Sequence, residues 1–276
     1  MRRWVARQKR RAWRSVTDHL RLHPSFLIIG AQRAGTTSLY NYLCEHPSVL
    51  PAARKELHFF DRAYSRGLSY YFRQYPTVWR SALPFGPRLI TGESTPYYLF
   101  HPLVAGRVRH ALPTVKLIVL LRNPVDRALS HYHHSVNKAA EPLSFEAAID
   151  REAERLAGEF ERLCSEPGYH SPAFNRYSYL ARGVYVDQLE RWMNVFPREQ
   201  FLILRSEDLY ANPKVALQSV FAFLRLPTCD INTSEQHNRQ DYAAMNPATR
   251  ARLREYFAPH NARLYRFLNR DFGWEN

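Results

Sequence analysis

The sequence is poor in cysteine and has no long apolar run. Its three cysteines, Cys44, Cys164 and Cys229, lie far apart in 276 residues, so their number and spacing indicate neither a disulfide framework nor a zinc site. No apolar stretch reaches the roughly 18 residues that a membrane-spanning helix requires, so we expect none. Internal repeats and Gly/Ser linkers are also missing. We therefore expect one domain over residues 25–276, preceded by a basic segment over 1–24.

Negative charge is also scarce. Asp and Glu number 25 against 39 Lys and Arg, and the net charge of +14 favours an anionic partner: a nucleotide, an acidic glycan, nucleic acid or an anionic membrane. The opening residues, MRRWVARQKRRAWR, are basic but lack the apolar core of a secretory signal. They are compatible with a solvated tail, or with a basic helix whose Trp4 and Trp13 rest on an anionic surface. Peripheral membrane contact therefore stays open.

Apolar runs alternate with helical patterns along the chain. The runs typical of buried strands are FLIIG (26–30), LIT (89–91), KLIVLL (116–121) and FLIL (201–204). Helices are expected after Thr36, from Pro124, from Ser144, over 184–195 and over 247–269, the last with Leu253, Tyr256, Phe257, Leu264 and Phe267 against the sheet. Such alternation predicts an α/β fold with a mostly parallel central sheet flanked by helices.

The first predicted strand continues into a loop and a helix in FLIIGAQRAGTTSLYNYL (26–43). A turn between a strand and a helix directs backbone N–H groups and the positive helix end at one point, which makes an anion site. Gly35 permits close backbone approach, Arg33 adds fixed charge, and the Thr-Thr-Ser run that follows adds hydroxyls, which are also N-cap candidates. The usual pattern G-x-x-x-x-G-K-[ST] is absent, because the cation precedes the glycine. The loop is P-loop-like and fits a phosphate or a sulfate.

The run KLIVLL ends in Arg122. A metal-dependent kinase or triphosphatase needs an acidic residue at such a strand end to hold magnesium, so a cation there argues against that class. Arg122 and Ser130 instead suit a second anion, because a guanidinium matches phosphate oxygens. Two anion sites at the ends of neighbouring parallel strands suit a nucleotide with phosphates at separate positions, such as a 3′,5′-bisphosphate.

Five motifs resemble, in order, those of sulfotransferases that depend on 3′-phosphoadenosine 5′-phosphosulfate (PAPS). They are FLIIGAQRAGTTSLYNYL (26–43), KELHFFD (55–61), TGESTPYYL (91–99), KLIVLLRNPVDRALSHY (116–132) and YFAPHNARLYRFLNRDFGW (256–274). The chain is most similar to the heparan sulfate N- and 3-O-sulfotransferase group and its bacterial relatives. The resemblance implies the sulfotransferase fold, a single sulfotransferase domain and sulfuryl transfer from PAPS.

The resemblance also implies roles for individual residues. Glu56 matches the catalytic carboxylate that takes the acceptor proton, and His58 matches a histidine that supports it. Burial beside the two following phenylalanines would raise the pKa of Glu56 towards the operating pH. Arg33 and Ser94 stand where the heparan sulfate enzymes have lysines; Arg33 keeps the charge that stabilises the leaving oxygen but cannot act as an acid. The residues expected to bind the cofactor are Arg33, Ala34, Gly35, Thr36, Thr37, Ser38, Arg122, Ser130 and Arg239. No metal is expected, since position and charge can accelerate the transfer.

The acceptor stays open: a hydroxyl or an amine of a glycan or a small metabolite is expected, and no nucleic acid. Golgi members of the family carry a membrane anchor and often a late disulfide. Because the sequence shows neither, we expect a cytoplasmic protein. Two alternatives remain, a P-loop-type nucleotide kinase or triphosphatase and a non-catalytic protein that binds polyanions through its net charge.

Overall fold

The computed structural model describes residues 21–77, 88–233 and 244–275. At its centre lies a five-stranded sheet in which every neighbouring pair of strands is parallel. The strands are β1 (Phe26–Gly30), β2 (Val49–Pro51), β3 (Ile90–Ser94), β4 (Lys116–Leu121) and β5 (Phe201–Arg205). Their spatial order is β2-β3-β1-β4-β5, so β1 is the central strand. The α/β class predicted from the sequence is confirmed.

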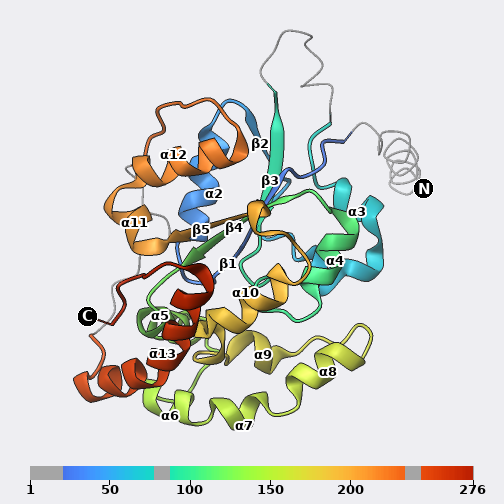
Figure 1. Cartoon of the computed structure of the whole chain (residues 1–276). Coiled ribbons are helices and arrows are strands. Elements are labelled where there is room, and N and C mark those ends of the chain that lie inside the picture. Colours follow the sequence, from blue (N-terminus) through green and yellow to red (C-terminus); the bar gives the residue numbers. More distant parts are fainter. Residues whose placement is uncertain (1–20, 78–87, 234–243, 276) are drawn as a thin grey trace.

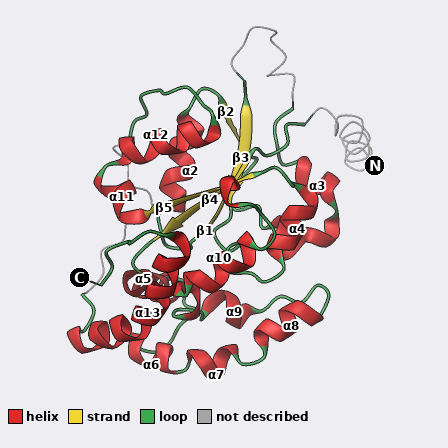
Figure 2. Ribbon diagram, in the orientation of Figure 1, coloured by secondary structure: helices red, strands yellow, loops and turns green. Residues whose placement is uncertain are grey.

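Helices lie on both sides of this sheet (Figures 1 and 2). The described α-helices are α2 (Thr36–Glu45), α3 (Leu68–Phe72), α4 (Val104–Ala111), α5 (Pro124–Asn137), α6 (Phe145–Asp150), α7 (Glu152–Leu156), α8 (Glu159–Ser165), α9 (Pro172–Arg176), α10 (Tyr185–Met193), α11 (Ser206–Ala211), α12 (Pro213–Leu224) and α13 (Pro247–Leu268). α2 and α12 lie on one side, where the rings of His46 and Phe221 are in contact, and α3, α4 and α10 lie on the other. This double cover explains why β1 is buried along its whole length.

The predicted starts of two helices are confirmed, and one cap differs. Asn123 caps α5 and Ser144 caps α6, each by accepting a hydrogen bond from a backbone N–H of the first turn. The N-cap of α2 is Gly35, whose φ angle is 89° and which has no side-chain cap. The Thr-Thr-Ser run, proposed as N-cap candidates, therefore lies inside the first turn of α2, where its hydroxyls are not used as caps.

Two further expectations were wrong. β2 was missed, because three residues are too few to show a strand periodicity. The last helix, α13, packs on α10 and α5 rather than on the sheet. Tyr256 and Phe267 are consequently exposed, whereas Leu253, Phe257 and Leu264 are buried as expected.

Candidate active site

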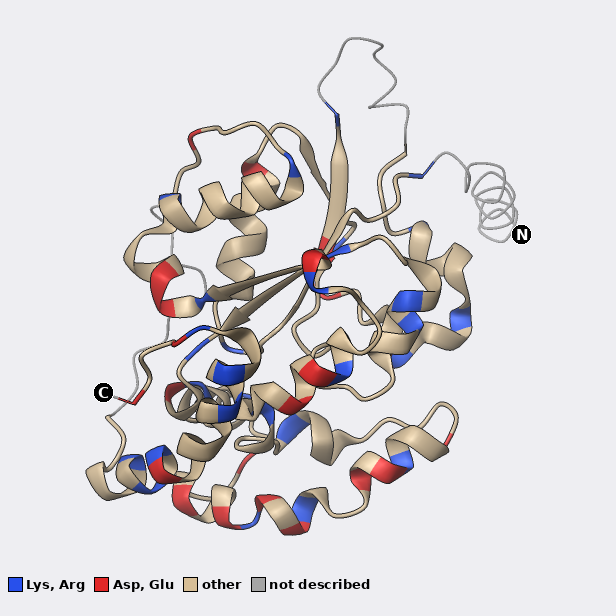
Figure 3. Ribbon diagram, viewed as in Figure 1, with Lys and Arg blue, Asp and Glu red and all other residues tan. Residues whose placement is uncertain are grey.

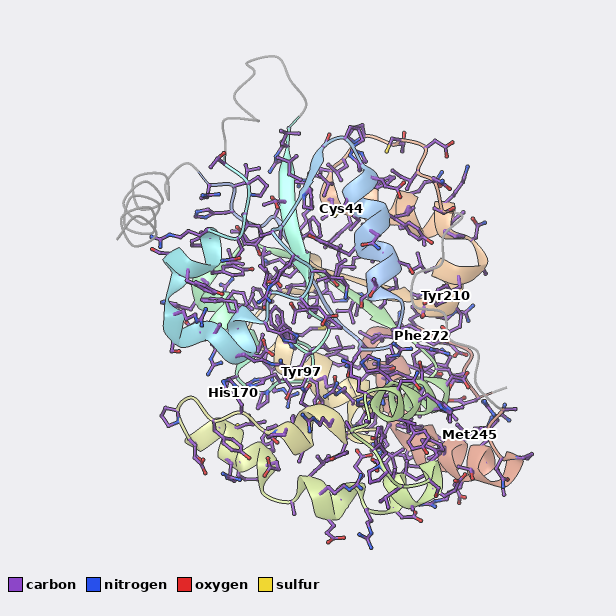
Figure 4. All side chains as sticks on the ribbon, turned by 180° about the vertical axis from the view of Figure 1, so that it is seen from behind. Cys44, Tyr97, His170, Tyr210, Met245 and Phe272 are labelled. Atoms are coloured by element: carbon purple, nitrogen blue, oxygen red, sulfur yellow. The ribbon has the colours of Figure 1, made fainter. Side chains whose placement is uncertain are left out.

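The loop after β1 is held in a tight conformation. Arg33 and Gly35 have φ angles of 69° and 89°, in the left-handed region. A Cβ atom at position 35 would lie 2.9 Å from the hydroxyl of Tyr210, which belongs to α11 and is labelled in Figure 4. The φ angle therefore favours glycine there, and a larger residue would also displace the Tyr210 hydroxyl. The Ser206 hydroxyl donates to the Ala34 carbonyl at 2.8 Å, which ties the loop to the start of α11.

The two predicted anion-binding motifs meet at the carboxyl ends of β1 and β4. Arg33 Nε donates a hydrogen bond to Ser130 Oγ at 3.0 Å. Arg122 Nη1 donates to the Arg33 carbonyl at 3.2 Å. Because β1 and β4 are neighbours in the sheet, residues that are 97 positions apart in the sequence come into direct contact. The structure thus brings Arg33, Arg122 and Ser130 together.

A buried arginine that is not among the residues predicted to bind the cofactor supports the same loop. Arg182 donates hydrogen bonds to Gln32 Oε1 and to the carbonyls of Phe174 and Asn175. Its guanidinium lies 4.9 Å from the ring centre of Tyr97, which is labelled in Figure 4. Burial lowers the pKa of Arg182 to about 9. No local motif could have revealed the contact with Gln32, because the two residues are 150 positions apart.

Glu56, His58 and Asp61 form a connected row of side chains after β2. His58 Nδ1 lies 2.7 Å from Asp61 Oδ2, and His58 Nε2 lies 3.5 Å from Glu56 Oε2. Lys55 Nζ lies 2.6 Å from the other Glu56 oxygen. Asp61 is buried, whereas the Glu56 side chain is 41% exposed. His58 therefore joins a buried carboxylate to an accessible one. The sequence motif contained Asp61, but its contact with His58 was not predicted.

The charges in this row determine its protonation. Burial opposes the charged form of Glu56, but the hydrogen bond from His58 and the charge of Lys55 outweigh burial and lower the pKa of Glu56 to about 2. Burial likewise opposes the charged form of His58, but hydrogen bonds to Asp61 and Glu56 raise its pKa to about 8. The expected upward shift for Glu56 is therefore wrong. The two phenylalanines are buried, yet Lys55 Nζ lies only 2.6 Å from the carboxylate.

Three residues of the site have a backbone conformation that is rare without glycine. Arg33, Glu56 and His58 have φ angles of 69°, 58° and 50°. The other described non-glycine residues with positive φ are Ala139, Arg225 and Asn269. Those three follow or cap helix C-termini, where the left-handed conformation is common. In the site no helix C-terminus accounts for it, so surrounding contacts must hold the strained backbone.

Charged groups from both the loop after β1 and the segment after β2 affect the pKa of His134 in α5. Burial, Lys138 and Arg33 lower its pKa to about 4, and Glu56 acts in the opposite direction. Arg33 and Glu56 therefore both act electrostatically on one side chain. Ser94, at the end of β3, is buried, and its carbonyl accepts a hydrogen bond from the Glu56 N–H at 3.1 Å. Arg239, the remaining predicted site residue, lies outside the described residues.

The donors at the two strand ends fit an anionic nucleotide. The ten-residue helix α2 directs its N-terminus at the loop that carries Arg33, and the absence of a side chain at Gly35 leaves the backbone accessible for close approach. Arg122 and Ser130 add a guanidinium and a hydroxyl next to that loop. Such a set of donors suits phosphate and sulfate oxygens, and it belongs to a chain whose fold is that of nucleotide-dependent transferases.

Comparison with known proteins identifies the family. The sulfotransferase domain family matches residues 23–263, and the chain belongs to that family. The membrane-associated sulfotransferase kil1 of Dictyostelium discoideum is 30% identical over 92% of this chain and 67% of its own length. Heparan sulfate glucosamine 3-O-sulfotransferase 6 of Homo sapiens is 30% identical over 92% of this chain and 74% of its own length. The crystal structure of a sulfotransferase from Alicyclobacillus acidocaldarius superposes with a TM-score of 0.74 at 32% identity, covering 92% of this chain and 99% of that one.

Family membership confirms the predicted reaction class: the protein is a PAPS-dependent sulfotransferase. The kinase and polyanion-binder alternatives are not favoured. β4 leads into Arg122 rather than an acidic residue. The excess positive charge also does not form a single basic stripe in the described chain, since α7 and α8 each carry both signs (Figure 3).

The predicted cytoplasmic location is wrong. The Dictyostelium relative, which aligns with 92% of this chain, is a membrane-associated enzyme. Few cysteines and the lack of a long apolar run in the sequence therefore do not indicate the compartment of this protein. Within the described residues, no helix has the length and apolar character needed to cross a membrane.

Proposed function

We propose that the protein transfers the sulfuryl group of PAPS to a hydroxyl of an acidic glycan, with Glu56 as the general base. The observation that carries this proposal is the hydrogen bond from the Glu56 N–H to Ser94 at the end of β3, which is the neighbour of the strand β1 that leads into Arg33. It supports a single reaction space between the anion-binding loop and the carboxylate, although the two come from different strand ends.

On the nucleotide side, PAPS supplies the sulfuryl group together with a phosphate leaving group. Arg33 stabilises the negative charge that develops on the leaving oxygen, as preorganised donors do in other transferases. The backbone of Ala34 and Gly35 and the hydroxyls in the first turn of α2 hold the 5′ side. Arg122 and Ser130 hold the 3′-phosphate. We propose no metal, because a cation follows β4 where a metal-binding site would need an acid.

On the acceptor side, Glu56 takes the proton of the attacking hydroxyl, and Asp61 holds His58 against Glu56. While His58 is charged, Glu56 is a weak base, because its pKa is about 2. Loss of the His58 proton removes that charge, so Glu56 becomes a stronger base as the pH rises through about 8. We expect the turnover rate to rise over the same interval.

The acceptor class follows from the charge around Glu56. Arg54 and Arg62 are exposed in the same segment as Glu56, and a cationic rim favours an anionic acceptor. Several curated relatives are heparan sulfate glucosamine 3-O-sulfotransferases, which transfer to a hydroxyl of an acidic glycan. These two observations support the choice of acceptor.

The first test is a thermal shift with adenosine 3′,5′-bisphosphate in EDTA, compared with ATP and magnesium. A ligand at about 100 times its Kd stabilises by about 2.7 kcal/mol, which is a shift of several degrees. Stabilisation by the bisphosphate alone supports the nucleotide site. Sulfate transfer from labelled PAPS to heparan sulfate, but not to neutral dextran, then tests the acceptor. Equal transfer to both would reject an acidic glycan.

We also propose that the basic segment 1–24 contacts an anionic membrane surface. Its opening run, MRRWVARQKRRAWR, combines cations with two tryptophans, and the relative in Dictyostelium is membrane-associated. Co-sedimentation with phosphatidylserine vesicles should exceed that with phosphatidylcholine vesicles. Removal of residues 1–20 should abolish the difference, and retention of the difference would reject the proposal.

A further inference from the structure

A fully buried carboxylate in β3 contacts the segment that follows β2. The Glu93 side chain is 0% exposed, and none of its described hydrogen-bond partners is a cation. Oε2 accepts from the Leu57 N–H at 3.3 Å and from the Thr95 hydroxyl at 2.7 Å. Oε1 accepts from the hydroxyls of Tyr71 at 2.9 Å and Tyr98 at 3.2 Å. Each oxygen is thus satisfied twice, which offsets the cost of its burial.

The Tyr98 hydroxyl extends this contact along the segment. It accepts hydrogen bonds from the backbone N–H groups of Phe59 at 3.0 Å and Phe60 at 3.4 Å, while donating to Glu93. One hydroxyl therefore connects two successive peptide groups to the buried carboxylate.

These bonds fix the backbone on both sides of His58. Before it, the Glu56 N–H donates to the Ser94 carbonyl and the next N–H donates to Glu93. After it, Tyr98 accepts from the next two N–H groups. Glu56 and His58 both have positive φ angles, which persist only where surrounding contacts hold them. The hydrogen bonds to β3 and Tyr98 supply those contacts.

The chemistry of the partners requires a carboxylate in this position. All four groups donate, which suits an ionised carboxylate because it only accepts. Burial raises the pKa of Glu93, and the hydrogen bonds from Thr95, Tyr71, Tyr98 and the Leu57 N–H act against that rise. A glutamine would direct its NH₂ group at two of these donors.

We propose that Glu93, acting directly on the Leu57 N–H and through the Tyr98 hydroxyl, is a positioning residue that aligns Glu56 with His58. It does not touch the acceptor itself. The inference rests on the proposed function only where it assigns Glu56 the role of base, because the backbone contacts are independent of catalysis.

The pKa of His58 reports this alignment without a catalytic assay. The charged groups that face His58 are Glu56, Asp61 and Arg62, and its pKa is about 8. NMR titration can follow its ring signal, assigned by its absence in His58→Gln. In Glu93→Gln and in Tyr98→Phe, we expect the pKa to fall towards the ordinary 6.5, because the imidazole loses its contact with Glu56. Above pH 8, where His58 is neutral in the wild type and in the variants, turnover should fall because Glu56 is misaligned, while the Kd for adenosine 3′,5′-bisphosphate stays unchanged.

Two comparisons sharpen this test. If Glu93 and Tyr98 act as one unit, the double variant should shift the pKa of His58 no further than the larger single variant does. Tyr75→Phe is the matched control. It removes a buried hydroxyl that donates to Tyr71 at 2.7 Å, at the outer end of the same network, and it leaves every bond to the 56–60 segment in place. Its His58 pKa should equal that of the wild type.

An unchanged His58 pKa in Glu93→Gln and Tyr98→Phe, or an equal shift in Tyr75→Phe, would overturn the proposal. If Glu93→Gln does not fold, Tyr98→Phe decides the question, because it keeps the carboxylate and the aromatic ring. A shifted pKa with unchanged turnover would uphold the positioning role and reject Glu56 as base. An unshifted pKa with an inactive Glu56→Gln would uphold the base and reject the positioning role.

Discussion

The loop after β1 and the segment after β2 share an unusual backbone conformation but differ in the charges of their contacts. Both hold non-glycine residues at positive φ, Arg33 in the first and Glu56 and His58 in the second. In the loop, Arg33 bonds to the Ser130 hydroxyl and Arg122 bonds to a backbone carbonyl, so these contacts leave the positive charge in place. In the segment, contacts join opposite charges.

The difference follows from what each region must do. An anion-binding loop needs a fixed cation, and arginine cannot lose its charge at any ordinary pH. A proton-accepting segment needs groups that titrate. In a row of carboxylates and a histidine, each group shifts the pKa of the groups beside it. The function of the loop should therefore depend little on pH, whereas the function of the segment should change with pH.

Glu56→Gln should have the largest effect, because it removes the proposed base and keeps the shape. We expect kcat to fall by about 10²- to 10⁴-fold, the usual contribution of a general base. Nucleotide affinity, measured by calorimetry with adenosine 3′,5′-bisphosphate, should stay unchanged. A large loss of nucleotide affinity with an unchanged kcat would mean that Glu56 helps to bind the nucleotide and is not the base.

Arg33→Ala should lower kcat by about 10²- to 10³-fold, the loss seen when one donor to a developing oxyanion is removed. Arg33→Lys is the control, since it keeps a cation at this position. It should recover most of the activity in single-turnover measurements with PAPS. If Arg33→Lys is as slow as Arg33→Ala, charge alone does not explain the role of the loop.

Arg122→Ala should weaken nucleotide binding rather than chemistry. Loss of a charge-assisted hydrogen bond costs about 1.5–3 kcal/mol, which raises Kd by about 10- to 100-fold. The comparison of adenosine 3′,5′-bisphosphate with adenosine 5′-phosphate isolates the 3′ contribution. The wild type should prefer the bisphosphate strongly and the variant only weakly. An equal preference in both proteins would mean that Arg122 does not bind the 3′-phosphate.

The meeting of the two predicted anion-binding motifs could be foreseen from the sequence because the signal of each motif is local. Strand, loop and helix follow one another within residues 26–43, and the Arg122–Ser130 motif follows another apolar strand. The adjacency of β1 and β4 then brings both motifs together. What the sequence missed on this side, Gln32 with Arg182, depends on a contact between residues 150 positions apart.

The acceptor half was only partly predictable. The motif KELHFFD indicated Glu56 and His58, but the direction of the Glu56 pKa shift depends on which neighbour lies closest. Burial of the phenylalanines pointed upward, whereas Lys55 at 2.6 Å and His58 at 3.5 Å move it downward. Those distances follow from positive φ angles that no pattern of residue types encodes.

The smallest expected effect is on the free energy of unfolding. Its dependence on pH distinguishes the segment after β2 from the loop after β1. Because folding raises the pKa of His58 from 6.5 to about 8, its ion pairs stabilise the protein fully below pH 6.5 and lose that effect as the pH rises through about 8. His58→Gln should therefore lower the free energy of unfolding by about 1–2 kcal/mol at pH 6 and by much less at pH 9. Denaturant titrations at the two pH values measure the difference. His110→Gln, which removes an exposed histidine in α4, is the control for the loss of an imidazole ring alone. An equal loss of free energy of unfolding in His58→Gln at pH 6 and pH 9 would mean that His58 contributes packing rather than charge. The contrast between the titrating segment and the permanently charged loop would then not hold.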